Sequence, residues 1–193
     1  MNGLYRPPSL AAVMAKDTFF LRGQVICAAD QNRDVTEIDL GAFVNLGTSK
    51  PQVLRIHSIQ VAWTDEQGLV PSIDAAAAVG DAKSAFSSCA ITTKATPLAN
   101  PAIPMLNDDE TVFTAALVAT NMNNDVDQGM MTAATDLAPQ HLVNGYLVGV
   151  DRLYLYGIAD NAWAETLAIS VCMECSTESV SKDSAIGLAL SQA

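Results

Sequence analysis

Basic residues are scarce in this chain. Ten Lys and Arg stand against 21 Asp and Glu, which gives 193 residues a formal net charge of −11. The ten cations are scattered between Arg6 and Lys182 without a cluster of three. A protein that binds nucleic acid must displace counterions from several phosphates, and docking on anionic lipid needs a basic face. The composition therefore predicts no direct contact with nucleic acid and a solvated, self-repelling surface.

Cysteines and long apolar runs are also few. The four cysteines are too few and too unevenly spaced to indicate a disulfide framework. They are Cys27, Cys89, Cys172 and Cys175. No uncharged apolar run reaches the roughly 18 residues that a membrane-spanning helix needs. Residues 1–8 lack a basic region followed by an apolar run, so we expect no signal peptide and synthesis in the cytoplasm.

The hydrophobic pattern is that of a chain built from strands. About eight segments show alternating or β-branched residues, with turn signals between them. They are residues 18–28, 36–44, 53–63, 85–95, 110–120, 138–150, 152–158 and 166–176. A parallel sheet would need helical patterns of roughly 10–15 residues between its strands, and these are missing. The sequence predicts an all-β fold, a single jelly roll or antiparallel β-sandwich.

Two of these segments predict local irregularities. Gly23 lies inside the first predicted strand and is expected to form a bulge. In the third, the apolar positions change phase between Ile56 and Ile59. Because a slip of one residue moves every following side chain to the other face, we predict a β-bulge near His57 and Ser58.

The chain divides into an arm, one domain and a tail. We expect residues 1–16, which contain two adjacent prolines, to form an irregular N-terminal arm, and residues 17–178 to form the jelly-roll domain. Residues 179–193 form a C-terminal tail, either a short helix capped at Ser181 or a strand-like extension. Both ends are expected to be flexible. Residues 74–79 predict a short helix within the domain.

The pair Cys172-Met-Glu-Cys175 is the one motif that resembles chemistry, since zinc sites and thioredoxin-like sites share its spacing. Zinc needs four ligands, and a redox pair opens a helix. The other candidate ligands, which are not paired locally, are Cys27, Cys89, His57 and His141. The pair lies at the end of a predicted strand, where residues three apart face opposite sides. We interpret both cysteines as small buried or half-buried residues.

Histidines and carboxylates suggest no stronger site. Neither His57 nor His141 is accompanied by a Gly-x-Ser-x-Gly elbow, and two distant histidines do not make a cupin-like metal cluster. The carboxylates of residues 108–110 and 125–127 either bind a divalent cation or are solvated loop acids. Residues 123–129 resemble a calcium loop but lack its final Glu and flanking helices. The sequence therefore predicts no catalytic, cofactor-binding or metal-binding residue.

The order of short strands, the proline-bearing arm and the closing pattern of residues 152–156 and 167–172 resemble a single jelly-roll capsid protein of an icosahedral virus. The resemblance is architectural and covers roughly residues 17–176. It implies a structural virion protein, not an enzyme and without a cofactor, that self-assembles into a shell with copies of itself or with other capsid proteins. Many such proteins of small RNA viruses begin with a genome-binding basic arm. This chain has none, which fits better the shells that enclose a membrane without inserting into it.

A second hypothesis is a β-sandwich recognition module, either a virion decoration domain or a carbohydrate-binding domain. Its loops at residues 65–73 and 121–135 would form the binding end. Sugar stacking needs exposed aromatic rings. We expect Trp63 to face the core, and Trp163, which lies in a turn, is the better contact candidate.

Overall fold

The computed structural model describes residues 17–74, 83–95, 102–121, 128–129 and 140–192. The strands are β1 (Phe19–Cys27), β2 (Arg33–Asp39), β3 (Gln52–Asp65), β4 (Ser72–Ile73), β5 (Lys83–Thr92), β6 (Thr111–Asn121), β7 (Gln128–Gly129), β8 (Gln140–Val148), β9 (Arg152–Ala159) and β10 (Leu167–Ser179). One helix, α1 (Lys182–Gln192), follows β10. The arm expected at residues 1–16 and most of the helix expected at 74–79 lie outside the described residues.

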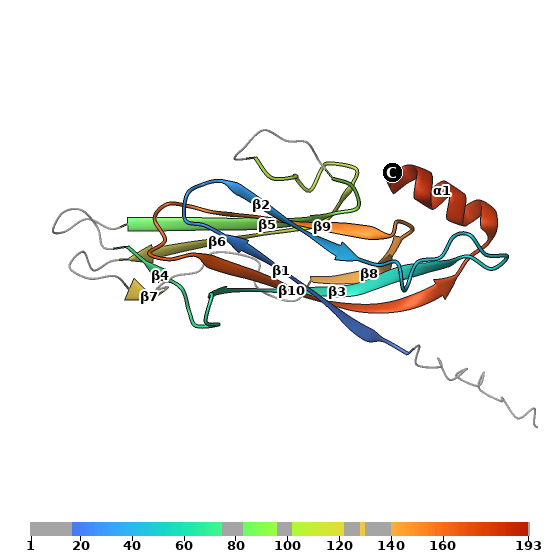
Figure 1. Ribbon diagram of the computed structural model, residues 1–193, viewed down its shortest axis with the longest axis horizontal. Coiled ribbons are helices and arrows are strands. Elements are labelled where there is room, and N and C mark those ends of the chain that lie inside the picture. The colour runs from blue at the N-terminus through green and yellow to red at the C-terminus, as the bar shows by residue number, and fades with distance from the viewer. Residues whose placement is uncertain (1–16, 75–82, 96–101, 122–127, 130–139, 193) are drawn as a thin grey trace, which may run out of the picture.

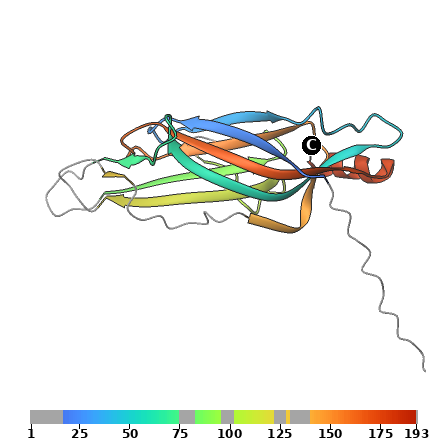
Figure 2. The same cartoon turned by 90° about the horizontal axis from the view of Figure 1, so that it is seen from below.

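Eight of the strands form two four-stranded antiparallel sheets that pack face to face (Figures 1 and 2). The β1 sheet has the order β1–β10–β3–β8, and the β2 sheet has the order β2–β9–β5–β6. The pairing is nested, because β1 pairs with β10, β2 with β9, β3 with β8 and β5 with β6. Successive pairs alternate between the two sheets, which is the strand order of a jelly roll. The predicted all-β jelly roll is confirmed.

The core lies between the two sheets and consists of side chains at alternate strand positions. The largest side chains that are fully buried are Leu40, Leu54, Ile56, Ile59, Ile73, Ile91, Phe113, Leu117, Leu153, Leu155, Leu167 and Ile169. In β6 the odd-numbered residues from Phe113 to Ala119 are buried, whereas Ala116 and Val118 are exposed. This alternation follows from the two-residue period of a strand that has one face on the core.

The bulge predicted in β3 is confirmed. The register of β3 with β8 shifts between Ile56 and Ser58. The register with β10 shifts at the same point, between Glu174 and Cys175. His57 is therefore the extra residue, and it allows the apolar side chains on both sides of it to point into the core.

Gly23 is not the bulge that the sequence predicts. It pairs in regular register with Val171 of β10. A Cβ atom at Gly23 would lie 2.6 Å from Cδ1 of Ile38, which belongs to the opposite sheet. Gly23 allows the two sheets to approach closely. A glycine inside a strand indicates either a bulge or such a close approach, and a single sequence does not distinguish the two.

Two further segments differ from their predicted extent. The strand expected over residues 36–44 ends at Asp39, since Asp39 Oδ1 accepts a hydrogen bond from the Gly41 amide and the chain then turns. The loop expected over residues 121–135 contains β7, which pairs with β4 in a small two-stranded ribbon.

The C-terminal tail is a helix, the first of its two predicted forms. Ser181 Oγ accepts a hydrogen bond from the Ser184 amide at 3.2 Å, which is the predicted cap. Gln192 is buried and fastens the helix to the end of β8: its Nε2 donates to the Leu147 carbonyl at 2.7 Å, and its Oε1 accepts from the Gly149 amide at 2.8 Å. Within the described part of the chain, no helix is long and apolar enough to cross a membrane.

Gly157 of β9 lies at a second point where the two sheets approach closely. A Cβ atom there would lie 2.6 Å from Cys27 Sγ and 2.8 Å from Val25 Cγ1. We expect Gly157→Ala to lower the free energy of unfolding by about 1–3 kcal/mol, because the core must shift to accept a methyl group. The matched control is Gly187→Ala on α1, where a Cβ meets nothing within 4 Å.

The control is expected to raise the free energy of unfolding by about 0.5–1 kcal/mol, since alanine is a better helix former than glycine. Urea unfolding followed by tryptophan fluorescence measures both variants. A Gly157→Ala protein as stable as the wild type would contradict the close approach of the sheets.

Candidate functional site

The paired cysteines of β10 face opposite sides of the sheet, as predicted. Cys175 is fully buried in the core, whereas Cys172 is half-buried on the outer face. Burial raises the pKa of the Cys175 thiol to about 12, and its Sγ contacts the Met173 carbonyl oxygen at 3.6 Å. Because their side chains lie on the two faces of one strand, the pair does not converge on a common ion.

The other two cysteines are also core residues. Cys27 of β1 and Cys89 of β5 are fully buried free thiols. Burial raises the pKa of each to about 12, and the nearby Asp34 carboxylate contributes to the shift at Cys27. Among the residues that the structure describes, no three His, Cys, Asp or Glu side chains gather closely enough to hold a metal ion.

The histidine and carboxylate candidates are separated in the fold. His57 Nε2 lies 2.8 Å from Ser176 Oγ across the bulge of β3 and β10. His141 is at the start of β8, where its backbone pairs with Ser58. Asp108 Oδ2 accepts a hydrogen bond from the Met105 amide at 2.8 Å and so holds a turn before β6. The carboxylates of residues 125–127 lie outside the described residues.

Trp163, the predicted contact residue of a recognition module, is buried. Its side chain is 2% exposed, and its Nε1 donates to the Phe86 carbonyl at 2.9 Å. This prediction is wrong, because the turn that carries Trp163 folds over the end of the core. Trp63 faces the core as predicted, and its Nε1 donates to Ser87 Oγ at 2.9 Å.

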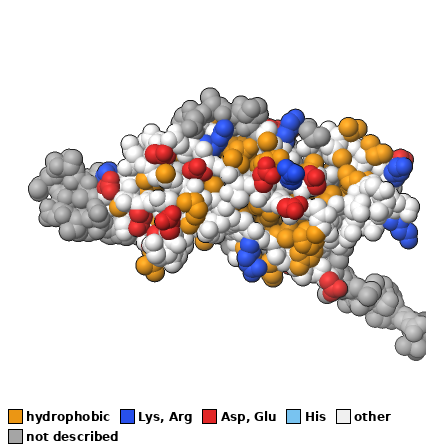
Figure 3. All heavy atoms as spheres, in the orientation of Figure 1, with side chains coloured by type: hydrophobic (Ala, Val, Ile, Leu, Met, Phe, Trp, Pro, Cys, Tyr) orange, Lys and Arg blue, Asp and Glu red, His pale blue; other side chains and the backbone are white. Residues whose placement is uncertain are grey.

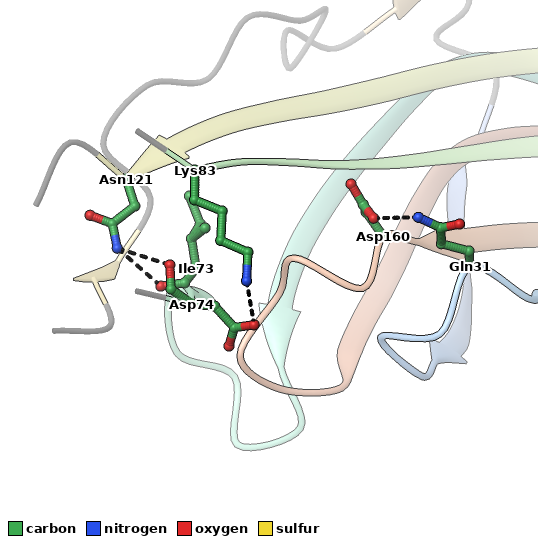
Figure 4. A network of polar contacts seen from close by, with 6 residues as sticks. All are labelled: Gln31, Ile73, Asp74, Lys83, Asn121 and Asp160. Carbon is green, nitrogen blue, oxygen red and sulfur yellow. Dashed lines mark hydrogen bonds and ion pairs between the residues drawn. The ribbon is translucent and has the colours of Figure 1, made fainter. Parts of the chain in front are cut away.

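Polar side chains tie the loops together at the end of the sandwich that carries β4 and β7 (Figure 4). Asn121 is fully buried, and its Nδ2 donates to the Asp74 carbonyl at 3.1 Å. Lys83 Nζ forms an ion pair with Asp74 at 2.7 Å, and Gln31 Nε2 donates to Asp160 Oδ1 at 2.7 Å. These contacts satisfy polar groups within the chain and fix the loop bases, which is a structural role.

Large apolar side chains are exposed on several sides of the molecule. Those more than 40% exposed are Phe20, Ile26, Val35, Leu69, Val70, Phe86, Met105, Leu106, Val118, Val143, Ile186 and Leu190. Phe86 and Val118 lie directly opposite each other on the outer face of the β2 sheet. Figure 3 shows hydrophobic side chains gathered between charged groups on one face. Isolated apolar side chains are ordinary on a surface, but neighbouring pairs on several sides indicate contact surfaces.

The outer face of the β1 sheet is hollowed across β1, β10 and β3. The hollow has a volume of about 490 Å³, and the outward side chains that line it belong to Arg22, Gln24, Gln60, Ala62, Ser170 and Cys172. Gln24 Nε2 donates to Ser170 Oγ at 3.0 Å. The Arg22 guanidinium lies 5.9 Å from the centre of the Phe20 ring. Sequence reasoning missed this hollow, because it depends on the register of three strands that are distant in sequence.

No family of known proteins matches the sequence, and no curated protein matches it either. Similar solved structures include VP1 of New Jersey polyomavirus (10% identity, TM-score 0.48, covering 86% of this chain and 100% of that chain). The Merkel cell polyomavirus virus-like particle gives 8% identity and a TM-score of 0.48, covering 86% of this chain and 76% of that chain. VP1 of trichodysplasia spinulosa-associated polyomavirus, in complex with 3'-sialyllactose, gives 9% and 0.46, covering 92% and 98%.

These similar structures are of VP1 capsid proteins, the class that the sequence resembles. The TM-scores lie below 0.5 and the identities at or below 10%. The assignment of the jelly roll accordingly rests on the nested strand order of the two sheets.

The burial of the thiols predicts their reactivity. In the native protein at about pH 8, we expect iodoacetamide to modify Cys172 at least about 100-fold faster than Cys27, Cys89 or Cys175, because these react only when the fold opens. Mass spectrometry of peptides from timed samples measures the four rates, and a urea-unfolded sample, in which all four react, is the control. Equal native rates at Cys172 and Cys175 would show that the two thiols share one environment.

Proposed function

We propose that this protein is a structural virion protein, a capsid subunit that assembles with copies of itself into a closed shell. The observation that carries the proposal is a jelly roll with exposed apolar side chains on the outer faces of both sheets, on two loops and on α1. A shell subunit contacts neighbours on several sides, and each contact buries apolar surface at its centre. A protein that binds a small molecule needs one concave pocket, and apolar side chains exposed elsewhere on its surface do not contribute to that binding.

The charge of the chain supports a shell built from protein–protein contacts. With ten cations against 21 anions, the subunit is repelled by phosphate, so we propose that other subunits, of this or another capsid protein, are its partners rather than nucleic acid. A shell built from protein–protein contacts is also compatible with a viral membrane that lies beneath it and into which the chain does not insert. The place of action is then the virion.

Lectins and cupins also have the jelly-roll fold, so the fold alone does not distinguish a capsid role from these other functions. The recognition module, the second hypothesis from the sequence, needs an exposed aromatic ring for sugar stacking. Its candidate Trp163 is buried beneath the loop end of the sandwich. Its remaining support is the loop of residues 65–73, where Leu69 and Val70 are 65% and 63% exposed. These aliphatic side chains suit a protein contact better than a sugar.

Assembly is expected to depend on salt. Copies that each carry a net charge of −11 repel one another, and raising the salt from about 0.01 M to 1 M shortens the Debye length from about 30 Å to 3 Å. We expect the yield of uniform closed particles to rise over this range. Light scattering of the purified protein, with negative-stain electron microscopy of the same samples, measures it. A monomer at every salt and protein concentration, or aggregates without a uniform diameter, would contradict the proposal.

A further inference from the structure

The outer face of β1 carries four exposed side chains in a row. Phe20, Arg22, Gln24 and Ile26 alternate with residues that face the core. Phe20 is 53% exposed and Ile26 is 42% exposed, so a cation and an amide lie between two apolar side chains. Three of the neighbouring outward residues, Cys172 and Ser170 of β10 and Ala62 of β3, are small, and the face is hollow beside Arg22.

Arg22 differs from three other cations of the strands, each of which has an acidic partner. Arg55 forms an ion pair with Glu178, Lys83 with Asp74, and Arg152 with Glu37. Arg22 has no carboxylate oxygen within 4 Å among the residues that the structure describes, and its guanidinium lies over the Phe20 ring. Arg22 can therefore accept an external carboxylate without giving up an ion pair of its own.

The groups around Arg22 suit a carboxylate. Ser170 and Gln60 place a hydroxyl and an amide on the same hollow. One acid, Glu174, lies on this face two positions along β10 from Cys172, and its Oε2 accepts a hydrogen bond from Ser58 Oγ at 3.3 Å. The hollow thus offers hydrogen-bond donors around one guanidinium, between two apolar side chains.

A complementary segment lies on the same chain, just before β6 of the other sheet. Met105 and Leu106 are 65% and 69% exposed. Asp108 is committed to its turn, because its carboxylate accepts from the Met105 amide and its own amide donates to the Met105 carbonyl at 3.0 Å. Asp109 is exposed and forms no hydrogen bond or ion pair within the described part of the chain, although it borders a hollow that Arg55 also lines. Residues 105–110 therefore present two apolar side chains next to a free carboxylate.

We propose that residues 105–110 of one copy dock on the outer face of the β1 sheet of a second copy. Asp109 meets Arg22, and Met105 and Leu106 pack against Phe20, two positions along β1 from Arg22. The two surfaces are different parts of the chain, so a contact made once between two copies is heterologous and generates a ring when its rotation closes. This inference rests on the proposed function and names the contact by which subunits associate.

Charge exchange tests the contact. We expect Arg22→Glu and Asp109→Arg each to reduce particle yield at about 0.1 M salt about tenfold or more, and the double variant to recover most of the yield, because it restores the pair with its signs exchanged. The control for Arg22→Glu is Lys50→Glu, which makes the same change of charge at an exposed loop residue that has no ion pair within the described part of the chain. Urea unfolding shows that each variant is folded.

Particle formation by Arg22→Glu at the wild-type level, or a double variant as defective as the single variants, would overturn this contact and leave the capsid role standing. A wild-type protein that forms no particles overturns the proposed function instead.

Cross-linking then detects the proposed contact between two copies whether or not closed particles form. In Asn107→Cys protein, a bis-maleimide should join the introduced thiol of one copy to Cys172 in the hollow of another. The combined variant Asn107→Cys, Cys172→Ser should lose that link. Cross-linked peptides without this pair would overturn the docking in any assembly state.

Discussion

The pairing of β3 with β10 is the constraint on which the rest of the fold depends. β10 pairs with β3 along its whole length and with β1 on its other edge, so the last strand of the chain lies inside its sheet. The paired residues are more than 100 positions apart, from Asp65 opposite Leu167 to Gln52 opposite Ser179. Because the entropy of closing so long a loop is lost before the contacts form, the β1 sheet is completed only after the final strand is available.

The same ladder builds the outer face of the β1 sheet. Its register sets Arg22 opposite Cys172 and Cys172 opposite Gln60, so that the hollow spans three strands whose residues are distant in sequence. The shared irregularity at His57 keeps core residues inside on both sides of the bulge, and the outward row on β10 stays continuous from Ser170 to Glu174. A regular ladder through this point would turn one half of β3 inside out.

Much of the fold could be predicted from local patterns, because alternation and turn chemistry are local. The phase change between Ile56 and Ile59 was sufficient to locate the bulge, and the serine at position 181 to locate the helix cap. Local patterns do not say what lies across the core. Gly23 was expected to form a bulge, but the glycine is needed because Ile38 of the other sheet lies against it. Trp163 was expected at the surface because the sequence indicates the turn that carries it but not the burial of its side chain. The contact surfaces were less predictable still, since the isolation of Arg22 is a property of the assembled sheet.

The charge and the apolar surface of the chain act in opposite directions, and in the proposed shell this opposition would make assembly selective. Exposed pairs such as Phe86 and Val118 favour association with any apolar surface, whereas a net charge of −11 opposes most approaches of one copy to another. An approach that sets Asp109 of one copy against Arg22 of another adds a local attraction, so it is favoured over approaches that bring only acidic groups together. A single ion pair adds little affinity at a surface, but it fixes the orientation in which the apolar contacts form. A shell needs this property, because its subunits must associate weakly enough to correct errors and in one arrangement only.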